Sequence, residues 1–233
     1  MKLTNISEIK GKIILKSGLH IGAGDMEMHI GGTDNPVIKH PHTLEPYIPG
    51  SSLKGKVRAL LELRSGLMAK TGGSPLSAKD LKNLSEEQKP ECEKILKIFG
   101  ASGAGADEMA ELGPTRVSFA DCPLNQDWRR KAGEKRLQLT EVKAETAIDR
   151  VSGTAKHGSL RSIERVPANT KFDFSVTLKQ FEGEEDLLDY LLGGLKLLEM
   201  DALGGNGSRG YGRIAFEFED EQIGNKFQGI SLF

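Results

Sequence analysis

The amino-acid sequence predicts an α+β fold in which helices cover one face of an antiparallel sheet. The clearest strand is KFDFSVTLKQF at 171–181, where apolar and polar residues alternate with the period of two that a half-buried strand shows. Residues 50–61 and 184–200 instead place their leucines at the spacing of an amphipathic helix. The two periods within one chain indicate that strands and helices pack into a common core.

The remaining elements fall into a simple order once the insertions are set aside. The predicted elements are a strand at 8–17, a helix from 50, a short helix at 91–99, a strand at 115–122, a strand at 171–181, a helix at 184–200 and a strand at 210–219. Without the short helix this is β-α-β-β-α-β, the ferredoxin-like (RRM-like) plait. We therefore expect one domain over 1–233, with insertions at about 65–113, partly flexible, and 124–168.

Charge is distributed unevenly, although the net charge is only -1. The second insertion is basic: residues 128–165 hold ten Lys and Arg against five Asp and Glu, whereas residues 182–201 hold seven acids and one lysine. A positive face beside a negative one suits a subunit that contacts a polyanion on one side. Solvated surface charge without a partner is the alternative.

Several classes of protein do not fit this chain. No apolar run approaches the length that spans a bilayer, and the first residues, MKLTNISEIKGK, lack the apolar stretch of a signal peptide. Cys92 and Cys122 lie in no disulfide or metal-ligand spacing. We expect a cytoplasmic protein that has no contact with a membrane.

A helix start at residues 50–58 resembles half of a nucleotide-binding loop. The letters GSSLKGK match GxxxxGK, but Val57 stands where a magnesium-binding hydroxyl is required, so no nucleotide cofactor is expected. Backbone N–H groups, hydroxyls and cations at a helix start can still grip a phosphate. The groups that would do so are Ser51, Ser52, Lys54 and Arg58. A simple capped amphipathic helix is the other interpretation.

A second glycine motif, GNGSRG, begins at Gly205. It matches GxGxxG, but it follows a helix and opens a strand, which is the wrong context for a dinucleotide site. Gly205 and Gly207 let a backbone approach a ligand closely, and Arg209 adds a cation, as a sugar-phosphate chain would need. A purely structural turn remains the alternative.

Five segments together resemble the RAMP superfamily. They are GLHIGAG (18–24), GGTDNPVIKHP (31–41), YIPGSSLKGKVRALLE (47–62), IDRVSGTAKHGSLRSIERVPANTKF (148–172) and LGGNGSRGYGRI (203–214). Within that superfamily the chain is similar to the repeated backbone subunits of type III-A (Csm) CRISPR complexes. The resemblance touches nearly the whole chain except 65–113. Where relatives often carry Asp after Arg or Lys, this chain has Lys39-His40-Pro41.

The resemblance implies a ribonucleoprotein subunit with an intrinsic nuclease activity. Copies would stack in a filament along CRISPR RNA beside other Csm-complex subunits, and a thumb-like β-hairpin at 148–165 would kink the guide–target duplex. Asp34 would then be required to cleave the target RNA at regular intervals through 2′-hydroxyl attack, leaving 2′,3′-cyclic phosphate and 5′-OH ends. We expect a divalent metal, Mg²⁺, to support cleavage, and no zinc, since His40, His42 and Cys92 do not form a ligand set.

RNA contacts are expected on His20, the helix start, the hairpin and the glycine loop. The hairpin residues are Lys156 and Arg161. A structural hydrogen bond is the alternative role for His20. Two other functions stay open: the equivalent type III-B backbone protein or an RNA-processing nuclease, and a non-catalytic RNA-binding scaffold in which Asp34 is only a turn residue.

Overall fold

The structure, a computed structural model, describes residues 1–24, 35–101 and 112–233. The helices and strands are β1 (Leu3–Leu15), α1 (Gly50–Arg64), α2 (Lys89–Phe99), β2 (Val117–Phe119), α4 (Gln126–Glu134), β3 (Glu141–Glu145), β4 (Arg161–Arg165), β5 (Lys171–Phe181), α5 (Leu188–Met200), β6 (Ile214–Phe218) and α6 (Glu221–Gly229). Short 3-10 turns occur at Leu67–Lys70, Ala78–Asn83 and Gly207–Arg209. None of the helices in the described ranges is long and apolar enough to cross a membrane.

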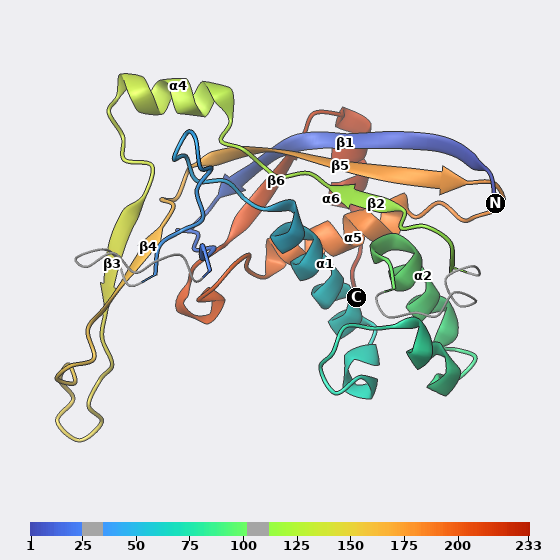
Figure 1. Ribbon diagram of the computed structural model, residues 1–233, viewed down its shortest axis with the longest axis horizontal. Coiled ribbons are helices and arrows are strands. Elements are labelled where there is room, and N and C mark those ends of the chain that lie inside the picture. The colour runs from blue at the N-terminus through green and yellow to red at the C-terminus, as the bar shows by residue number, and fades with distance from the viewer. Residues whose placement is uncertain (25–34, 102–111) are drawn as a thin grey trace.

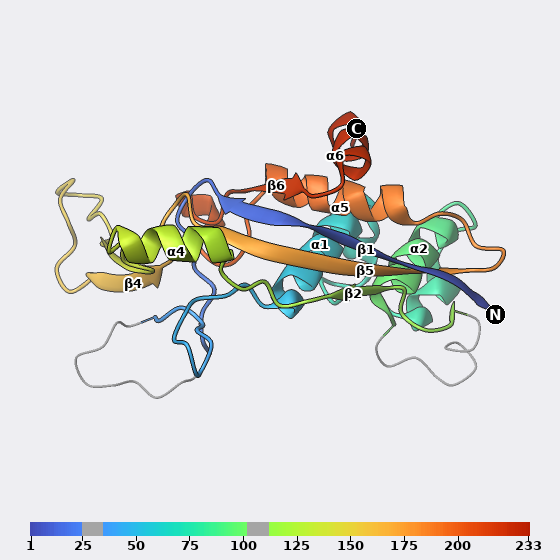
Figure 2. The ribbon, with the colours of Figure 1, turned by 90° about the horizontal axis from the view of Figure 1, so that it is seen from above.

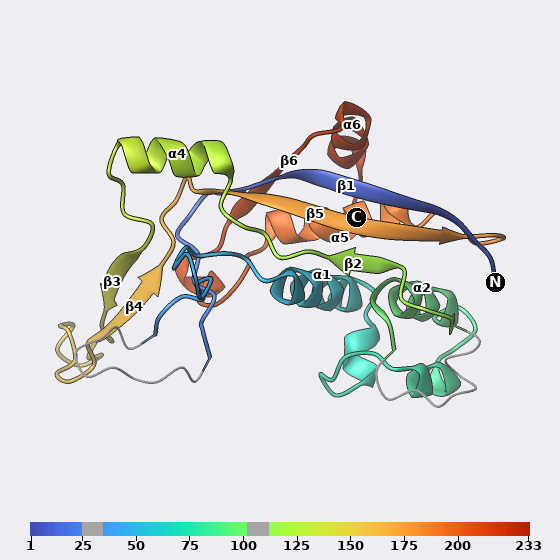
Figure 3. The same cartoon turned by 45° about the horizontal axis from the view of Figure 1, so that its top comes forward.

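Four strands form one antiparallel sheet in the order β2-β5-β1-β6 (Figure 1). β1 pairs with β5 along nearly its whole length, and its second half also pairs with β6. Helices α1 and α5 contact each other and lie together on one face of this sheet (Figure 3). The predicted ferredoxin-like plait is therefore confirmed, with β1, β2, β5 and β6 as its four strands.

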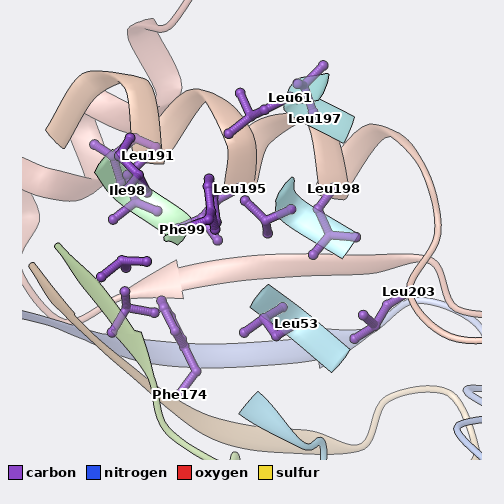
Figure 4. Packing of buried hydrophobic residues seen from close by; sticks show 14 of the residues in the cluster. Leu53, Leu61, Ile98, Phe99, Phe174, Leu191, Leu195, Leu197, Leu198 and Leu203 are labelled. Atoms are coloured by element: carbon purple, nitrogen blue, oxygen red, sulfur yellow. The ribbon is translucent and has the colours of Figure 1, made fainter. Parts of the chain in front are cut away.

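The core lies between the sheet and these two helices (Figure 4). Leu53 of α1, Leu195 of α5 and Phe174 of β5 are each at most 3% exposed. Burying one such leucine contributes about 1.5–3 kcal/mol to stability. Gly194 allows the two helices to approach, because a Cβ at this position would lie 2.7 Å from Val57 Cγ1.

The first insertion packs onto the core more firmly than its polar composition suggested. Leu67, Leu76 and Leu84 are buried and belong to the same hydrophobic cluster as the helices. Helix α2 adds Ile95 and Phe99 to that cluster. A few apolar side chains among many polar ones hold the short turns of this insertion against the core, and its expected partial flexibility stays a prediction.

The second insertion contains a helix and a hairpin. Asn125 caps the start of helix α4, and its side chain accepts a hydrogen bond from the amide of Trp128 at 3.1 Å. Strands β3 and β4 then pair antiparallel, from Glu141 opposite Arg165 to the joining segment 146–160. Seen from above, this hairpin continues beyond the end of the main sheet (Figure 2). The thumb-like hairpin expected at 148–165 is present, but its first strand starts earlier and α4 was not predicted.

Several boundaries differ from the sequence prediction. β1 starts at Leu3 rather than at residue 8. The sequence did not predict residues 3–8 as strand because they are all exposed and show no apolar alternation. β2 is only three residues long, and α6 was missed. Helix α6 is short, with Asp220 accepting hydrogen bonds from its first amides and Phe227 as its one buried side chain.

Candidate nucleic-acid interface

The glycine loop, residues 201–213 between α5 and β6, packs on the segment that follows β1. The amide of Gly205 donates to the carbonyl of His20 at 2.8 Å, and the amide of Gly212 donates to the carbonyl of Gly18 at 2.9 Å. Gly212 has a φ of +71°, and a Cβ there would lie 1.9 Å from a carbonyl oxygen of the same loop. Only glycine fits position 212, so this end of the glycine loop has a structural role whether or not RNA contacts the loop.

His20 connects the glycine loop to the hairpin. Its Nδ1 lies 2.7 Å from the carbonyl oxygen of Glu164 in β4, and its own carbonyl accepts the amide of Gly205. The imidazole is half-buried. The structural hydrogen bond that was the alternative role is thus present, and RNA contact by the remaining ring nitrogen stays a prediction.

The carboxylate of Glu164 anchors the segment 35–39. It accepts the amide of Val37 at 2.9 Å and the ammonium of Lys39 at 2.6 Å, and the residue is only 7% exposed. Burial raises the pKa of this carboxyl, but hydrogen bonds from Lys39, Thr140 and the Val37 amide outweigh burial and hold the pKa below its ordinary value. Lys39, next to His40 where relatives often carry Asp, therefore has a defined partner.

Asp34 itself lies outside the described residues, but the residue that follows it is held in place. Asn35 forms a parallel bridge with Ile163 of β4, and its carbonyl accepts the amide of Glu164 at 3.1 Å. Asn35 therefore lies against strand β4 of the hairpin.

A second carboxylate, that of Glu145 at the end of β3, gathers a group of cations. It accepts the Tyr211 hydroxyl at 2.8 Å and lies 3.3 Å from the Lys143 ammonium. The guanidinium groups of Arg209 and Arg161 lie 3.3 and 3.5 Å from its other oxygen. We call these five residues the Glu145 cluster. It joins both hairpin strands to the glycine loop.

Tyr211, a residue of the glycine loop, is fully buried where the loop meets the hairpin. Its ring lies under two cations, with the Lys143 ammonium 4.7 Å and the Arg165 guanidinium 5.0 Å from the ring centre. Burial first, and then the neighbouring Glu145, raise the pKa of the Tyr211 hydroxyl. The same hydrogen bond lowers the pKa of Glu145, with burial opposing and Lys143 and Arg209 assisting. Both groups therefore keep the protonation states that the bond requires at neutral pH.

The start of α1 presents part of the predicted phosphate grip. Ser51 is exposed, Ser52 and Lys54 are half-buried, and no ion pair involves Lys54 among the described residues. Burial, with a smaller effect of a neighbouring arginine, lowers the pKa of Lys54. Lys56, two residues on, lies 2.7 Å from Asp201 at the beginning of the glycine loop. The helix start and the glycine loop are therefore neighbours.

Arg58 does not belong to this grip. Its guanidinium pairs with Glu62 at 2.7 Å and donates to the carbonyls of Gly100 and Leu76 at 3.0 and 2.5 Å. The side chain is only 14% exposed. The sequence placed Arg58 one turn from Lys54 correctly, but the first insertion covers it, and its donors are used to hold that insertion.

The joining segment of the hairpin is exposed and basic. Lys156 and Arg150 make no ion pair with any described residue, and the Lys156 side chain faces solvent. Arg161 differs, since its guanidinium belongs to the Glu145 cluster while its Nε is buried without a hydrogen-bond partner in the described part of the chain. The structure therefore divides the two predicted hairpin cations between the tip and the base.

The predicted acidic face does not form as such, because six of the seven acids between 182 and 201 are paired with cations. The pairs are Glu182–Lys2, Glu184–Arg116, Glu185–Lys94, Asp189–Lys226, Glu199–Lys196 and Asp201–Lys56. The remaining acid, Asp186, accepts the amide of Leu188 at 2.9 Å. Local charge patterns missed the neutralising partners, most of which come from distant parts of the chain.

Within the described ranges, no three His, Cys, Asp or Glu side chains gather closely enough to hold a metal ion. Cys92 and Cys122 are buried and unpaired.

Glu145, Glu164 and Lys143 organise this region together with Tyr211, and the sequence predictions had not included the first three. Glu145 and Glu164 are acids inside a basic insertion, and this contrast was the one sequence signal for their role. The sequence does not show which cations will surround each carboxylate. Lys143 and Arg161 meet Glu145 within the hairpin, whereas the contacts of Tyr211 with Glu145 and of Lys39 with Glu164 depend on the hairpin packing against the glycine loop and the segment 35–39.

The comparisons with known proteins agree on one family. A family model described as the RAMP superfamily matches residues 12–216. The chain is 40% identical to the CRISPR system Cms endoribonuclease Csm3 of Methanocaldococcus jannaschii, over 89% of this chain and 79% of that protein. It is 37% identical to the protein of the same name from Methanothermobacter thermautotrophicus, over 90% of this chain and 82% of that protein.

A solved structure shares both the fold and sequence similarity. The crystal structure of a Csm3–Csm4 subcomplex of the type III-A CRISPR–Cas interference complex covers 93% of this chain and 78% of its own, with a TM-score of 0.54 and 30% identity.

Proposed function

Because the chain belongs to the RAMP superfamily and to its Csm3 family, we propose that it is a repeated, RNA-binding backbone subunit of a type III-A CRISPR ribonucleoprotein. The observation that carries this is the joining of motif segments far apart in sequence. The 35–39 segment, β4 of the hairpin, His20 and the glycine loop meet through Glu164 and its neighbours. A long chain of phosphates could run over such a continuous surface.

RNA would be held mainly through its backbone. The groups proposed to contact it are Ser51, Ser52 and Lys54 at the start of α1, Gly205, Gly207 and Arg209 in the glycine loop, Lys156 and Arg161 in the hairpin, and His20. Contacts of this kind position a strand without reading its bases, as a subunit that binds many guide sequences requires.

The proposed reaction is cleavage of the target RNA beside the hairpin. The 2′-hydroxyl attacks the adjacent phosphorus and forms the 2′-O–P bond as the P–O5′ bond breaks. The carboxylate of Asp34 takes the 2′-hydroxyl proton, and the departing 5′-oxygen is protonated by solvent. The products are a 2′,3′-cyclic phosphate and a 5′-OH end. A divalent ion, Mg²⁺, is proposed as the cofactor on the grounds of family resemblance alone.

The proposed partners are CRISPR RNA, target RNA, further copies of this chain and other Csm subunits. The relative in the Csm3–Csm4 subcomplex assembles with a different subunit. Head-to-tail contacts between copies give an open array unless the rotation closes a ring, so the number of copies should follow the length of the RNA.

The first test is purification of the chain with its natural partners, followed by sequencing of the small RNA that accompanies it. We expect RNAs that share one repeat-derived 5′ sequence. Mass photometry with RNAs of increasing length then tests the backbone role, and the assembled mass should rise in steps. RNA of random origin, or a dimer of constant mass on every RNA, would contradict the proposal.

A further inference from the structure

In the Glu145 cluster the carboxylate is far less exposed than the three cations around it. Its three cations, Lys143, Arg161 and Arg209, are 39%, 43% and 46% exposed, whereas the carboxylate between them is only 11% exposed. The anion therefore lies beneath and the cations lie above it. Three positive charges around one negative charge leave an excess of two on the outer side.

The position of this group is set by the fold. Tyr211 is 0% exposed and donates its hydroxyl to Glu145, so the carboxylate is tied to the buried side of the glycine loop. Gly210 and Gly212 on either side of Tyr211 have φ values of +84° and +71°, a left-handed backbone conformation that glycine adopts readily. Lys143 reaches the cluster from β3, Arg161 from β4 and Arg209 from the loop, so no single element could build the cluster.

The cations also retain unused capacity to donate hydrogen bonds. The Arg161 guanidinium is the most distant of the three from the carboxylate, at 3.5 Å. Its Nε is buried without a partner among the described residues, while its side chain is 43% exposed. Arg209 shares its terminal nitrogen between Glu145 at 3.3 Å and Asn206 at 3.0 Å. Guanidinium groups held half-exposed in this way can pair with the two free oxygens of a phosphodiester.

We propose that Glu145 is a positioning residue that gathers Lys143, Arg161 and Arg209 into one binding site for an RNA phosphodiester, at the junction of the hairpin and the glycine loop. This inference rests on the proposed RNA-binding function and assigns a residue and a place to it. The carboxylate does not touch the phosphate. It offsets the repulsion among three cations and fixes where they point, and Tyr211 fixes the carboxylate.

Glu145 could instead simply occupy the place of a phosphate, and the substitution Glu145→Gln distinguishes this interpretation from a positioning role. If Glu145 merely occupied the place of a phosphate, removing its charge would strengthen RNA binding. If it positions the cations, Glu145→Gln should weaken binding although the protein becomes more positive. Gln has nearly the same shape and can still accept the Tyr211 hydroxyl, so the change isolates the charge.

The experiment measures fluorescence anisotropy of the purified full-length chain with labelled single-stranded RNA over a range of KCl concentrations. For Glu145→Gln we expect affinity to fall by about fivefold to tenfold. The slope of log Kd against log[KCl] should become shallower by about 0.7 for each phosphate that the variant no longer neutralises. The matched control is Glu134→Gln, the same change at an exposed residue of α4 without an ion pair to any described residue, and its affinity should stay equal or rise slightly.

Two further variants separate positioning from a general loss of structure. In the Arg209→Gln background, adding Glu145→Gln should cost less affinity than it does in the wild type, because the carboxylate acts partly through Arg209. Tyr211→Phe keeps the buried ring and removes only the hydroxyl, and should weaken RNA binding by about twofold to threefold. It also replaces Glu145→Gln as the test if thermal melts show that the latter fails to fold.

The outcomes are distinguishable. If the wild-type chain binds RNA with a steep salt dependence and Glu145→Gln binds as tightly or more tightly, the positioning role is wrong and the proposed function stands. If the wild-type chain shows no salt-dependent RNA binding, the proposed function itself fails.

Discussion

The ammonium of Lys39 lies 2.6 Å from Oε1 of Glu164, and this contact joins the segment that follows Asp34 to strand β4 of the hairpin. The same carboxylate accepts the amide of Val37. Two motifs that lie more than a hundred residues apart in the sequence therefore share one buried anion. The geometry couples the position of the segment 35–39 to the position of the hairpin.

Replacing this anion should loosen both elements. We expect Glu164→Gln to lower the free energy of unfolding by about 1–3 kcal/mol, because a largely buried carboxylate loses a charged hydrogen bond and Lys39 loses its partner. Urea denaturation measures the effect. Glu8→Gln is the matched control, since it removes an exposed partner of Lys10 and should leave stability unchanged. Equal effects of the two changes would contradict the role given to Glu164.

The contribution of Glu164 should also depend on pH. Its pKa in the folded protein lies below the ordinary value of 4.5, so the carboxylate stabilises the fold above that pH. This stabilisation disappears as the pH falls through the folded-state pKa. The difference in unfolding free energy between the wild type and Glu164→Gln should therefore be greatest at neutral pH and shrink in acid. A difference that is the same at both pH values would show that the charge is irrelevant.

Lys54 and Arg58 should behave differently although they lie one turn apart. Lys54→Ala should weaken RNA binding and make its salt dependence shallower, with little change in stability, because the lysine has no ion pair with any described residue. Arg58→Ala should instead lower the free energy of unfolding by about 3 kcal/mol, since it leaves Glu62 buried without its partner. Anisotropy and urea denaturation of both variants give the comparison. A destabilised Lys54→Ala with normal RNA affinity would reverse the assignment.

Asp34→Asn should separate cleavage from binding. Affinity for guide and target depends on many phosphate contacts, so it should stay near that of the wild type. Loss of a catalytic base should slow cleavage by about 10²–10⁴-fold. A gel assay of the assembled complex measures the cleavage rate, and the same assay with EDTA tests whether cleavage needs a divalent metal ion. Asp127→Asn, at an exposed residue of α4, is the control.

The ends of the cut RNA give a second readout of the same reaction. A 2′,3′-cyclic phosphate blocks ligation that needs a 3′-hydroxyl, and the 5′-OH end accepts phosphate from a kinase without prior dephosphorylation. Cleavage by Asp34→Asn at the wild-type rate would leave Asp34 as a turn residue only.

Both cysteine thiols should be inert in the folded protein. Burial is the main cause that raises the pKa of Cys92 to about 11 and that of Cys122 to about 12, so both thiols stay protonated at neutral pH. Iodoacetamide at mildly alkaline pH should therefore label neither, and both should react once guanidinium chloride unfolds the chain. Mass spectrometry counts the labels. Rapid labelling of the native protein would show that the core opens near these residues.

The fold class followed from local patterns. The alternation of 171–181, the helical spacing after residue 50 and after residue 184, and the strand patterns at 8–17, 115–122 and 210–219 together predicted the β-α-β-β-α-β order, because each element of a plait must bury one face. Short or atypical elements were not accessible in this way. Helix α6 is nine residues long with one buried side chain, so its periodic signal is short, and the first residues of β1 are all exposed, so they show no alternation.

The motifs likewise marked the candidate interface, since segments rich in glycine and cations meet there in the structure. Only the tertiary structure decided what each cation does. Arg58 is taken up by Glu62 and two carbonyls, and Arg161 and Arg209 converge on Glu145 from different elements. The physical reason is that ion pairs form through space. A sequence shows which charges a chain carries, and the fold alone determines which of them find partners and which stay open to a ligand.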